Sequence, residues 1–223
     1  MSRPRAVVFD LDGTLLDSRL DIARAANRAL CAHGFPERSV DEIVGFVGDG
    51  ARLLVSRALN FADADPRVDA VLQTFLDDYT AHAVVHSRLL PGAREALDAL
   101  DGLPLALCTN KPRATTDVVL EALDLARHFR VVLAGGDTPE KKPDPAPLLA
   151  VAERLGLPPA ALVMVGDGPQ DVLAGRAAGC VTVAVVGPLV PRDCLAELSP
   201  NALLDGLDQL PALVERWRAQ ATS

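Results

Sequence analysis

The sequence predicts an α/β fold, in which a parallel sheet is covered by helices on both faces and one long helical segment is inserted. Amphipathic segments alternate with short apolar runs along most of the chain, which favours right-handed βαβ units. The runs have the composition of strands buried on both faces, and they lie at Ala6–Phe9, Leu105–Cys108, Val131–Leu133, Leu162–Val165 and Thr182–Val186. The helices between the last four are expected at Ala114–Leu123, Pro147–Leu155 and Asp171–Ala178. The segment Leu203–Trp217 predicts a short strand and a last helix on the sheet.

The stretch between Phe9 and Leu105 is much longer than one crossover needs, and its pattern predicts helices only. Small apolar residues recur at helical spacing in Asp21–His33, before Gly34. Further helix signals are the capping-box pattern Ser39-x-x-Glu42, the segment Ala51–Leu59, the Asp65-Pro66 helix start, and the apolar stripe Val68, Val71, Leu72, Phe75, Leu76 and Tyr79. We therefore assign residues 15–90 to a helical cap domain and residues 1–14 and 91–223 to the α/β core domain.

Composition excludes several classes of function. The chain has 223 residues, 49% of them hydrophobic and 23% charged, which is typical of a globular protein. Its net charge of −8 provides no basic surface for nucleic acid or an anionic membrane, and it lacks an apolar run of ~18 residues. The four cysteines form no C-x-x-C pair, and an apolar run starts soon after Met1 without a signal peptide. These features predict a cytoplasmic protein with reduced thiols.

Four polar clusters each follow a predicted strand. They are Asp10-Leu11-Asp12-Gly13-Thr14, Thr109-Asn110-Lys111, Lys141-Lys142-Pro143 and Gly166-Asp167-Gly168-Pro169-Gln170-Asp171. Because the carboxyl ends of parallel strands line the ligand-binding edge of an open sheet, we expect the four clusters to meet there. Taken singly, the second is also common turn chemistry, the third is also a charged loop, and Asp171 is also a helix N-cap.

Together the clusters indicate phosphoryl chemistry. Two acids as close as Asp10 and Asp12 repel each other unless a cation or a proton lies between them. Carboxylates at this density suit Mg²⁺, which keeps waters and substrate phosphate oxygens among its ligands. A hydroxyl and a lysine would neutralise phosphoryl oxygens. The sequence offers no Ser/His/Asp or Cys/His arrangement, whereas an aspartate serves as nucleophile through an aspartyl-phosphate.

With all four clusters in order, the chain resembles the haloacid dehalogenase superfamily phosphatases that carry a helical cap after the first motif. This resemblance implies a Rossmann-like core. Within the superfamily the chain is similar to the phosphoglycolate phosphatases, on the stretches Val47-Gly48-Asp49-Gly50-Ala51, Thr109-Asn110-Lys111-Pro112, Gly135-Gly136-Asp137-Thr138 and Lys142-Pro143-x-Pro145.

The resemblance implies roles for both acids of the first motif. Asp10 would attack phosphorus and ligate Mg²⁺. Asp12 would protonate the leaving alkoxide, then activate water, and its backbone carbonyl would also bind Mg²⁺. Asp167 would be the second carboxylate on the metal, with Asp171 as a supporting acid.

The remaining roles concern substrate binding. Thr109, Asn110 and Lys142 would hold the phosphoryl oxygens, and Lys142 would also orient Asp10. The cap residues expected near the leaving group are Gly48, Asp49, Gly50 and Arg52. A substrate carboxylate would need a cation there, and Arg52 is the nearest in sequence. Asp49 would repel such a group, unless it caps the helix that starts near Ala51.

We therefore predict a Mg²⁺-dependent phosphomonoesterase, with 2-phosphoglycolate as the first substrate. The alternatives are a sugar phosphate, an amino-sugar phosphate or pyrophosphate as substrate, or an inactive phosphate-sensing scaffold. The expected partner is a small phosphorylated metabolite, without nucleic acid or membrane, and the protein would be a monomer or homodimer.

Overall fold

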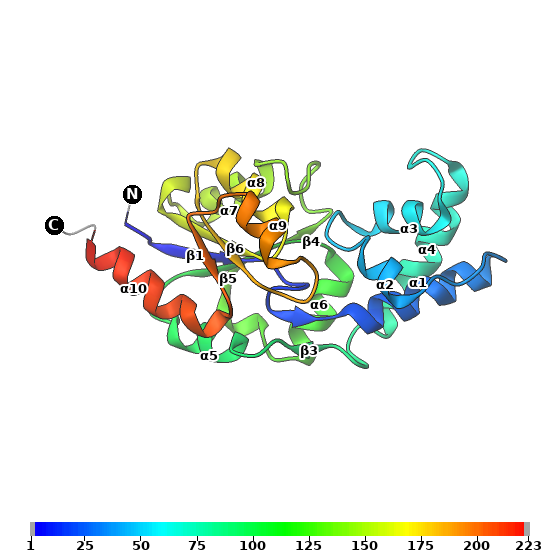
Figure 1. The fold of residues 1–223 in the computed structure, drawn as a ribbon, viewed down its shortest axis with the longest axis horizontal. Helices are drawn as coiled ribbons and strands as arrows, with labels where there is room; N and C mark the ends of the chain where they lie inside the picture. The colour runs from blue at the N-terminus through cyan, green and yellow to red at the C-terminus, as the bar shows by residue number, and fades with distance from the viewer. Residues whose placement is uncertain (1–2, 221–223) are drawn as a thin grey trace.

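A six-stranded parallel sheet organises the computed structural model, which describes residues 3–220 (Figure 1). Residues 1–2 and 221–223, which the prediction assigns to the core domain, lie outside the described residues. The strand order is β5-β4-β1-β6-β7-β8, with bounds Ala6–Phe9 (β1), Leu105–Pro112 (β4), Phe129–Gly135 (β5), Leu162–Gly166 (β6), Val181–Val185 (β7) and Ala202–Leu204 (β8). The prediction of an α/β fold with a parallel sheet is confirmed.

Alternate side chains of β1 enter different hydrophobic layers. Val7 and Phe9 pack in the layer with α5 (Ala93–Ala99), α6 (Arg113–Ala122) and α10 (Leu210–Gln220). Ala6 and Val8 pack in the opposite layer with α7 (Ala146–Leu155) and α8 (Pro169–Ala178). A short helix, α9 (Arg192–Glu197), lies beyond β7. Both faces of β1 are therefore buried, which explains its wholly apolar sequence.

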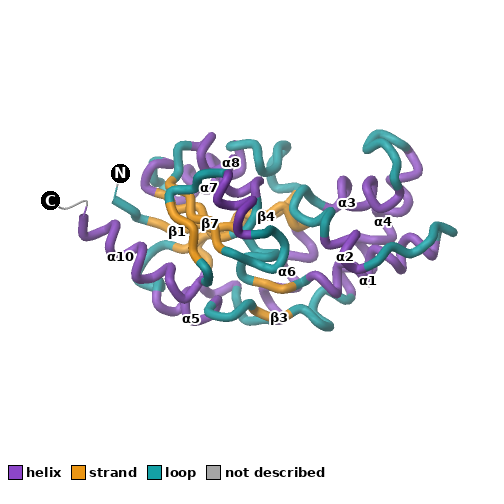
Figure 2. Tube along the Cα trace, viewed as in Figure 1, coloured by secondary structure: helices purple, strands orange, loops and turns teal. Residues whose placement is uncertain are grey.

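Four helices lie within residues 15–90, and they project from one end of the sheet (Figures 1 and 2). They are α1 (Arg19–Ala32), α2 (Val40–Val44), α3 (Ala51–Leu59) and α4 (Pro66–Ala81). The expectation of helices only is wrong at the two ends of this segment. There β2 (Leu16–Asp17) and β3 (Arg88–Leu89) pair antiparallel and join the outgoing chain to the returning chain.

The predicted helix starts in this segment are confirmed. The Ser39 hydroxyl accepts a hydrogen bond from the backbone N–H of Glu42 (3.2 Å), and the Glu42 carboxylate accepts one from the backbone N–H of Ser39 (2.8 Å). The Asp65 carboxylate accepts from the backbone N–H of Arg67 at 2.9 Å. Of the predicted stripe on α4, Val68, Val71, Phe75 and Tyr79 are buried. No helix within residues 3–220 has the length and apolar character needed to cross a bilayer.

A buried carboxylate joins α1 to the chain before β3. Asp21 is 3% exposed and accepts hydrogen bonds from the backbone N–H groups of His86 (2.8 Å) and Ser87 (2.7 Å) and from the Ser87 hydroxyl (2.8 Å). Burial raises the pKa of Asp21, but these hydrogen bonds together outweigh it and lower the pKa. The carboxylate therefore stabilises the fold above its unfolded pKa of about 3.9, and this stabilisation is lost as the pH falls through the lower folded pKa.

Asp21→Asn is expected to lower the free energy of unfolding by about 1.5–3 kcal/mol at pH 7, because an amide replaces a charged acceptor of several hydrogen bonds. Urea unfolding measures this change. The difference from the wild type should shrink below about pH 4, as the wild-type carboxylate becomes protonated. Asp77→Asn, on the exposed face of α4, is the control and should change stability by less than about 0.5 kcal/mol. A difference that stayed constant down to pH 2 would contradict the role given to the Asp21 charge.

Candidate active site

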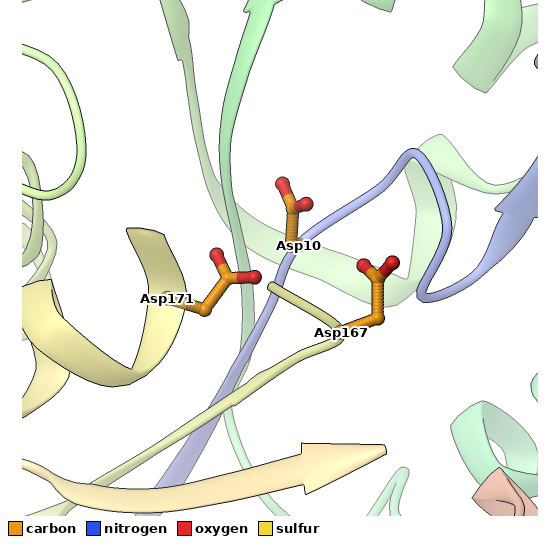
Figure 3. A group of neighbouring side chains, drawn as sticks. All are labelled: Asp10, Asp167 and Asp171. Atoms are coloured by element: carbon orange, nitrogen blue, oxygen red, sulfur yellow. The ribbon is translucent and has the colours of Figure 1, made fainter. Parts of the chain in front are cut away.

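Three buried carboxylates meet at the carboxyl edge of the sheet (Figure 3). Asp10 follows β1, Asp167 follows β6, and Asp171 lies in the first turn of α8. Each offers an oxygen within 4.8 Å of the others, and their exposures are 5%, 1% and 1% respectively. The neighbouring positions of β1 and β6 in the sheet bring together acids that are far apart in the chain.

Two glycines make room for this acidic cluster of Asp10, Asp167 and Asp171. A Cβ on Gly166 would lie 2.2 Å from the Asp171 carboxylate. Gly13 has a φ of +87°, and a Cβ there would lie 2.1 Å from Asp167 Oδ2. Any larger residue at either position would displace a carboxylate.

Lys142 supplies a positive charge to the acidic cluster. Its Nζ lies 3.0 Å from Asp10 Oδ1 and donates to Asp171 Oδ1 at 2.6 Å, and the residue is 1% exposed. Burial acts to lower the pKa of Lys142, but the charges of Asp10 and Asp171 outweigh it and raise the pKa. Burial raises the pKa of Asp171 to about 6, an effect that Lys142 opposes.

The cluster has fewer cationic groups than carboxyl groups, which fits a divalent cation. One lysine faces three carboxylates, and burial, followed by the charges of Asp171 and Asp10, raises the pKa of Asp167 well above its ordinary value. Asp167 Oδ1 accepts from the Thr14 hydroxyl at 2.7 Å, whereas Asp167 Oδ2 is buried without a hydrogen-bond partner among residues 3–220. Closely spaced, hard carboxylate oxygens with a free acceptor are the ligands that Mg²⁺ prefers.

The carboxylate of Asp12 belongs to a second group of side chains. It accepts a hydrogen bond from the Ser18 hydroxyl at 2.6 Å. Lys111 Nζ donates to both of its oxygens, at 2.9 and 3.1 Å, and also contacts the Tyr79 hydroxyl. Burial, followed by the charge of Asp12, raises the pKa of Tyr79, so the phenol stays protonated at neutral pH. Asp12 and Asp10 thus face different partners.

Asn110 connects Lys142 to the helical segment that follows β1. Its amide nitrogen donates to the carbonyls of Gly48 (2.9 Å) and Lys142 (2.8 Å), and its oxygen accepts from the backbone N–H of Lys142 at 3.0 Å. Both amide protons are therefore in use, and the geometry makes the side chain a positioning group for Lys142 in this conformation. The Thr109 hydroxyl is buried nearby and accepts from the backbone N–H of Lys111 at 3.2 Å.

A small cavity lies beside these groups, between the sheet edge and the helical segment. Its polar wall comes from Asp10, Asp12, Thr109, Asn110 and Lys111, and its other wall from Ile22, Val47, Gly48, Gly50, Ala51, Leu54, Phe75 and Tyr79. Its volume is about 40 Å³, compared with the roughly 10–15 Å³ that one water needs on this measure. The cavity suits a leaving group of a few heavy atoms.

The structure corrects the expected positions of two cap residues. Gly48 and Gly50 line the cavity, but Arg52 does not, because its guanidinium pairs with Asp69 (2.6 Å) and Asp63 (3.3 Å). Asp49 is not a helix cap: Gly50 occupies that position. The Asp49 carboxylate instead pairs with Arg57 at 2.7 Å, outside the cavity lining.

The sequence-based site omits Lys111 and Tyr79. Lys111 stands in the second polar cluster and is one of only three lysines in the chain, so a signal existed. Tyr79 belongs to the apolar stripe of α4. The helical spacing of this stripe predicts a buried side chain, but it does not show that the Tyr79 hydroxyl reaches the site.

Comparisons with known proteins agree with this geometry. The family model of haloacid dehalogenase-like hydrolases matches residues 4–179. The phosphoglycolate phosphatase of Escherichia coli K12 is 37% identical over 94% of this chain and 92% of its own. A crystal structure described as a predicted phosphoglycolate phosphatase from Haemophilus somnus superposes with a TM-score of 0.87, at 30% identity, over 96% of this chain and 99% of the other. A hydrolase from Pseudomonas syringae superposes with a TM-score of 0.78, at 27% identity, over 95% and 98%.

Proposed function

Because the chain belongs to the haloacid dehalogenase-like hydrolase family, we propose that it is a Mg²⁺-dependent phosphatase that converts 2-phosphoglycolate to glycolate and phosphate. The observation that carries the proposal is the buried acidic cluster with Lys142, next to a small cavity that contains a second buried lysine. The relatives named phosphoglycolate phosphatase support the choice of substrate.

In the proposed reaction Asp10 attacks phosphorus and forms an aspartyl-phosphate, while the leaving alkoxide takes a proton from Asp12. Asp12 then removes a proton from the water that hydrolyses the intermediate, so that phosphate is released and Asp10 is regenerated. Lys142 and Thr109 hold phosphoryl oxygens, and Asn110 and Asp171 keep Lys142 in place.

Asp10, Asp167 and the backbone carbonyl of Asp12 would hold Mg²⁺, which neutralises phosphoryl charge when it is bound. Thr14 fixes one oxygen of Asp167 and leaves the other free for this purpose. Asp171 supports the site through Lys142 and through the hydrogen bond that its carboxylate accepts from the backbone N–H of Gly168 at 3.1 Å.

Residues 15–90 would act as the cap over a core made of residues 1–14 and 91–223. Gly48 and Gly50 lie against the core, where Asn110 and Lys141 donate to the carbonyls of Gly48 and Asp49. A cap held in this way excludes water from the reacting atoms. The proposal includes a small phosphorylated metabolite as the partner, a monomer or homodimer, and a location in the cytoplasm.

The substrate proposal is tested by kcat/KM values for a panel of phosphorylated metabolites in the presence of Mg²⁺. We expect 2-phosphoglycolate to exceed sugar phosphates by at least about 10-fold. A strong sugar phosphate beside a weak 2-phosphoglycolate would contradict the substrate while leaving the phosphatase proposal intact.

Removal of the metal is expected to lower activity by at least about 100-fold, because the cation supplies several kcal/mol of charge stabilisation. EDTA followed by re-addition of Mg²⁺, with p-nitrophenyl phosphate as substrate, measures this effect. Full turnover after complete chelation would contradict the metal site.

A further inference from the structure

Lys111 is buried at the boundary between the core and the cap. Its side chain is 1% exposed, and its Nζ contacts Asp12 from the core and the Tyr79 hydroxyl from α4. The ammonium also lies 4.3 Å from the centre of the Tyr79 ring. These contacts fix its position beside Asp12, in the lining of the cavity.

Among the described residues, Lys111 contributes the only cationic side chain to the lining of the cavity. Lys142 is held by Asp10 and Asp171, and Arg52 is held by Asp63 and Asp69. A carboxylate that entered the cavity would therefore meet one cationic side chain, Lys111, which already pairs with Asp12.

The apolar wall of the cavity makes the charge of Lys111 decisive for the binding of a carboxylate. Most of the cap wall is apolar, with Ile22, Val47, Leu54 and Phe75 among its side chains. An unpaired carboxylate in such surroundings would lose its hydration without compensation. A charge-assisted hydrogen bond from a buried ammonium offsets this loss, and a neutral group of the same size gains no such benefit.

Lys111 and Tyr79 both have donor capacity for an incoming anion. The two oxygens of Asp12 share the ammonium with the Tyr79 hydroxyl, and Ser18 also holds Asp12. The ammonium has three N–H groups, and an anion that replaced the Tyr79 hydroxyl as acceptor would leave both contacts with Asp12 in place. The Tyr79 oxygen accepts from Lys111, and Ser18 is a further hydrogen-bond partner of the phenol.

We propose that Lys111, with the Tyr79 hydroxyl beside it, is the specificity-determining site that binds the carboxylate of the leaving group. This inference rests on the proposed function and deepens it. It replaces Arg52, the cation that the sequence indicates, with a lysine from the core. The substrates selected are phosphomonoesters whose leaving group carries a carboxylate one carbon from the ester oxygen.

The test compares 2-phosphoglycolate with 2-hydroxyethyl phosphate, in which a hydroxymethyl group replaces the carboxylate. Lys111→Met removes the charge and keeps an unbranched side chain. The preference of the wild type for 2-phosphoglycolate, as a ratio of kcat/KM values, should fall about 10- to 100-fold in this variant, because a hydrogen bond to a charged group is lost. Tyr79→Phe should lower the ratio about 3- to 10-fold. Arg52→Met is the matched control and should retain the wild-type ratio.

A binding measurement separates recognition from catalysis. Calorimetric titration with 3-phosphonopropionate and propylphosphonate, in the presence of Mg²⁺, compares analogues with and without the carboxylate. Lys111→Met should weaken only the first, by about 10-fold or more. The carboxylate site would be overturned if Lys111→Met weakened both phosphonates equally, lowered kcat/KM equally for both phosphomonoesters, or retained the wild-type preference. Any of these results would leave the proposed phosphatase activity intact. A wild type that hydrolysed neither phosphomonoester would instead refute the proposed function.

Discussion

Asp10→Asn is expected to lower kcat by at least about 10⁴-fold, because an amide oxygen is a poor nucleophile and the two-step route through an aspartyl-phosphate is lost. The variant should nevertheless remain folded. Asp10 lies within 4.8 Å of two other carboxylates, so removing its charge relieves repulsion in the metal-free protein. The unfolding temperature without Mg²⁺ should therefore equal or exceed that of the wild type.

Asp117→Asn is the matched control for this change. Asp117 lies on α6, its side chain is 58% exposed, and it forms an ion pair with Arg113 at 3.0 Å. Its replacement should leave kcat within a factor of about two. Substantial turnover by a folded Asp10→Asn variant would contradict the nucleophile assignment.

Lys142→Met has the second large expected effect, on stability and activity together. The substitution leaves Asp10 and Asp171 without the ammonium that lies 3.0 and 2.6 Å from them. Breaking a buried ion pair by removing one partner costs about 3–5 kcal/mol, so the free energy of unfolding should fall by that amount at neutral pH. Activity should fall by at least about 100-fold, since the phosphoryl oxygens lose a positive charge.

A double-mutant cycle distinguishes the two effects. Adding Asp171→Asn to Lys142→Met removes one uncompensated charge and should restore at least about 1 kcal/mol of stability, without restoring turnover. Urea unfolding and phosphate release measure the two quantities. If stability and activity recovered together, Lys142 would be a structural residue only.

The strands and the acidic cluster could be predicted from the sequence because each depends on local chemistry. Ala6–Phe9 forms β1 as predicted, since a strand buried on both faces requires apolar residues at every position. Asp10 and Asp167 meet because parallel strands end at the same edge of the sheet. The predicted strand ends were less accurate. The sequence predicts a strand that ends at Cys108, whereas β4 continues to Pro112 and pairs there with Gly135, after an irregularity that the sequence does not signal.

Features that depend on distant contacts could not be predicted. The pairing of Leu16 with Leu89 joins two residues on either side of a long helical segment, and two-residue strands have no periodicity of their own. The choice between Arg52 and Lys111 depended on side-chain direction. Asp63 and Asp69 lie where they hold Arg52, while Asp12 and Tyr79 hold Lys111 at the cavity. Proximity in sequence therefore indicated a cation that does not line the cavity.

Asp10 is proposed to carry the phosphoryl group from the substrate to water, and chemical trapping tests this role most directly. The enzyme is quenched during turnover of 2-phosphoglycolate with Mg²⁺ and treated with borohydride, which reduces an acyl phosphate to the alcohol. Peptide mass spectrometry should then find homoserine at position 10 and at no other acidic residue, and only when both Mg²⁺ and substrate were present. Unmodified Asp10 under rapid turnover, or homoserine at Asp12, Asp167 or Asp171 instead, would contradict the account.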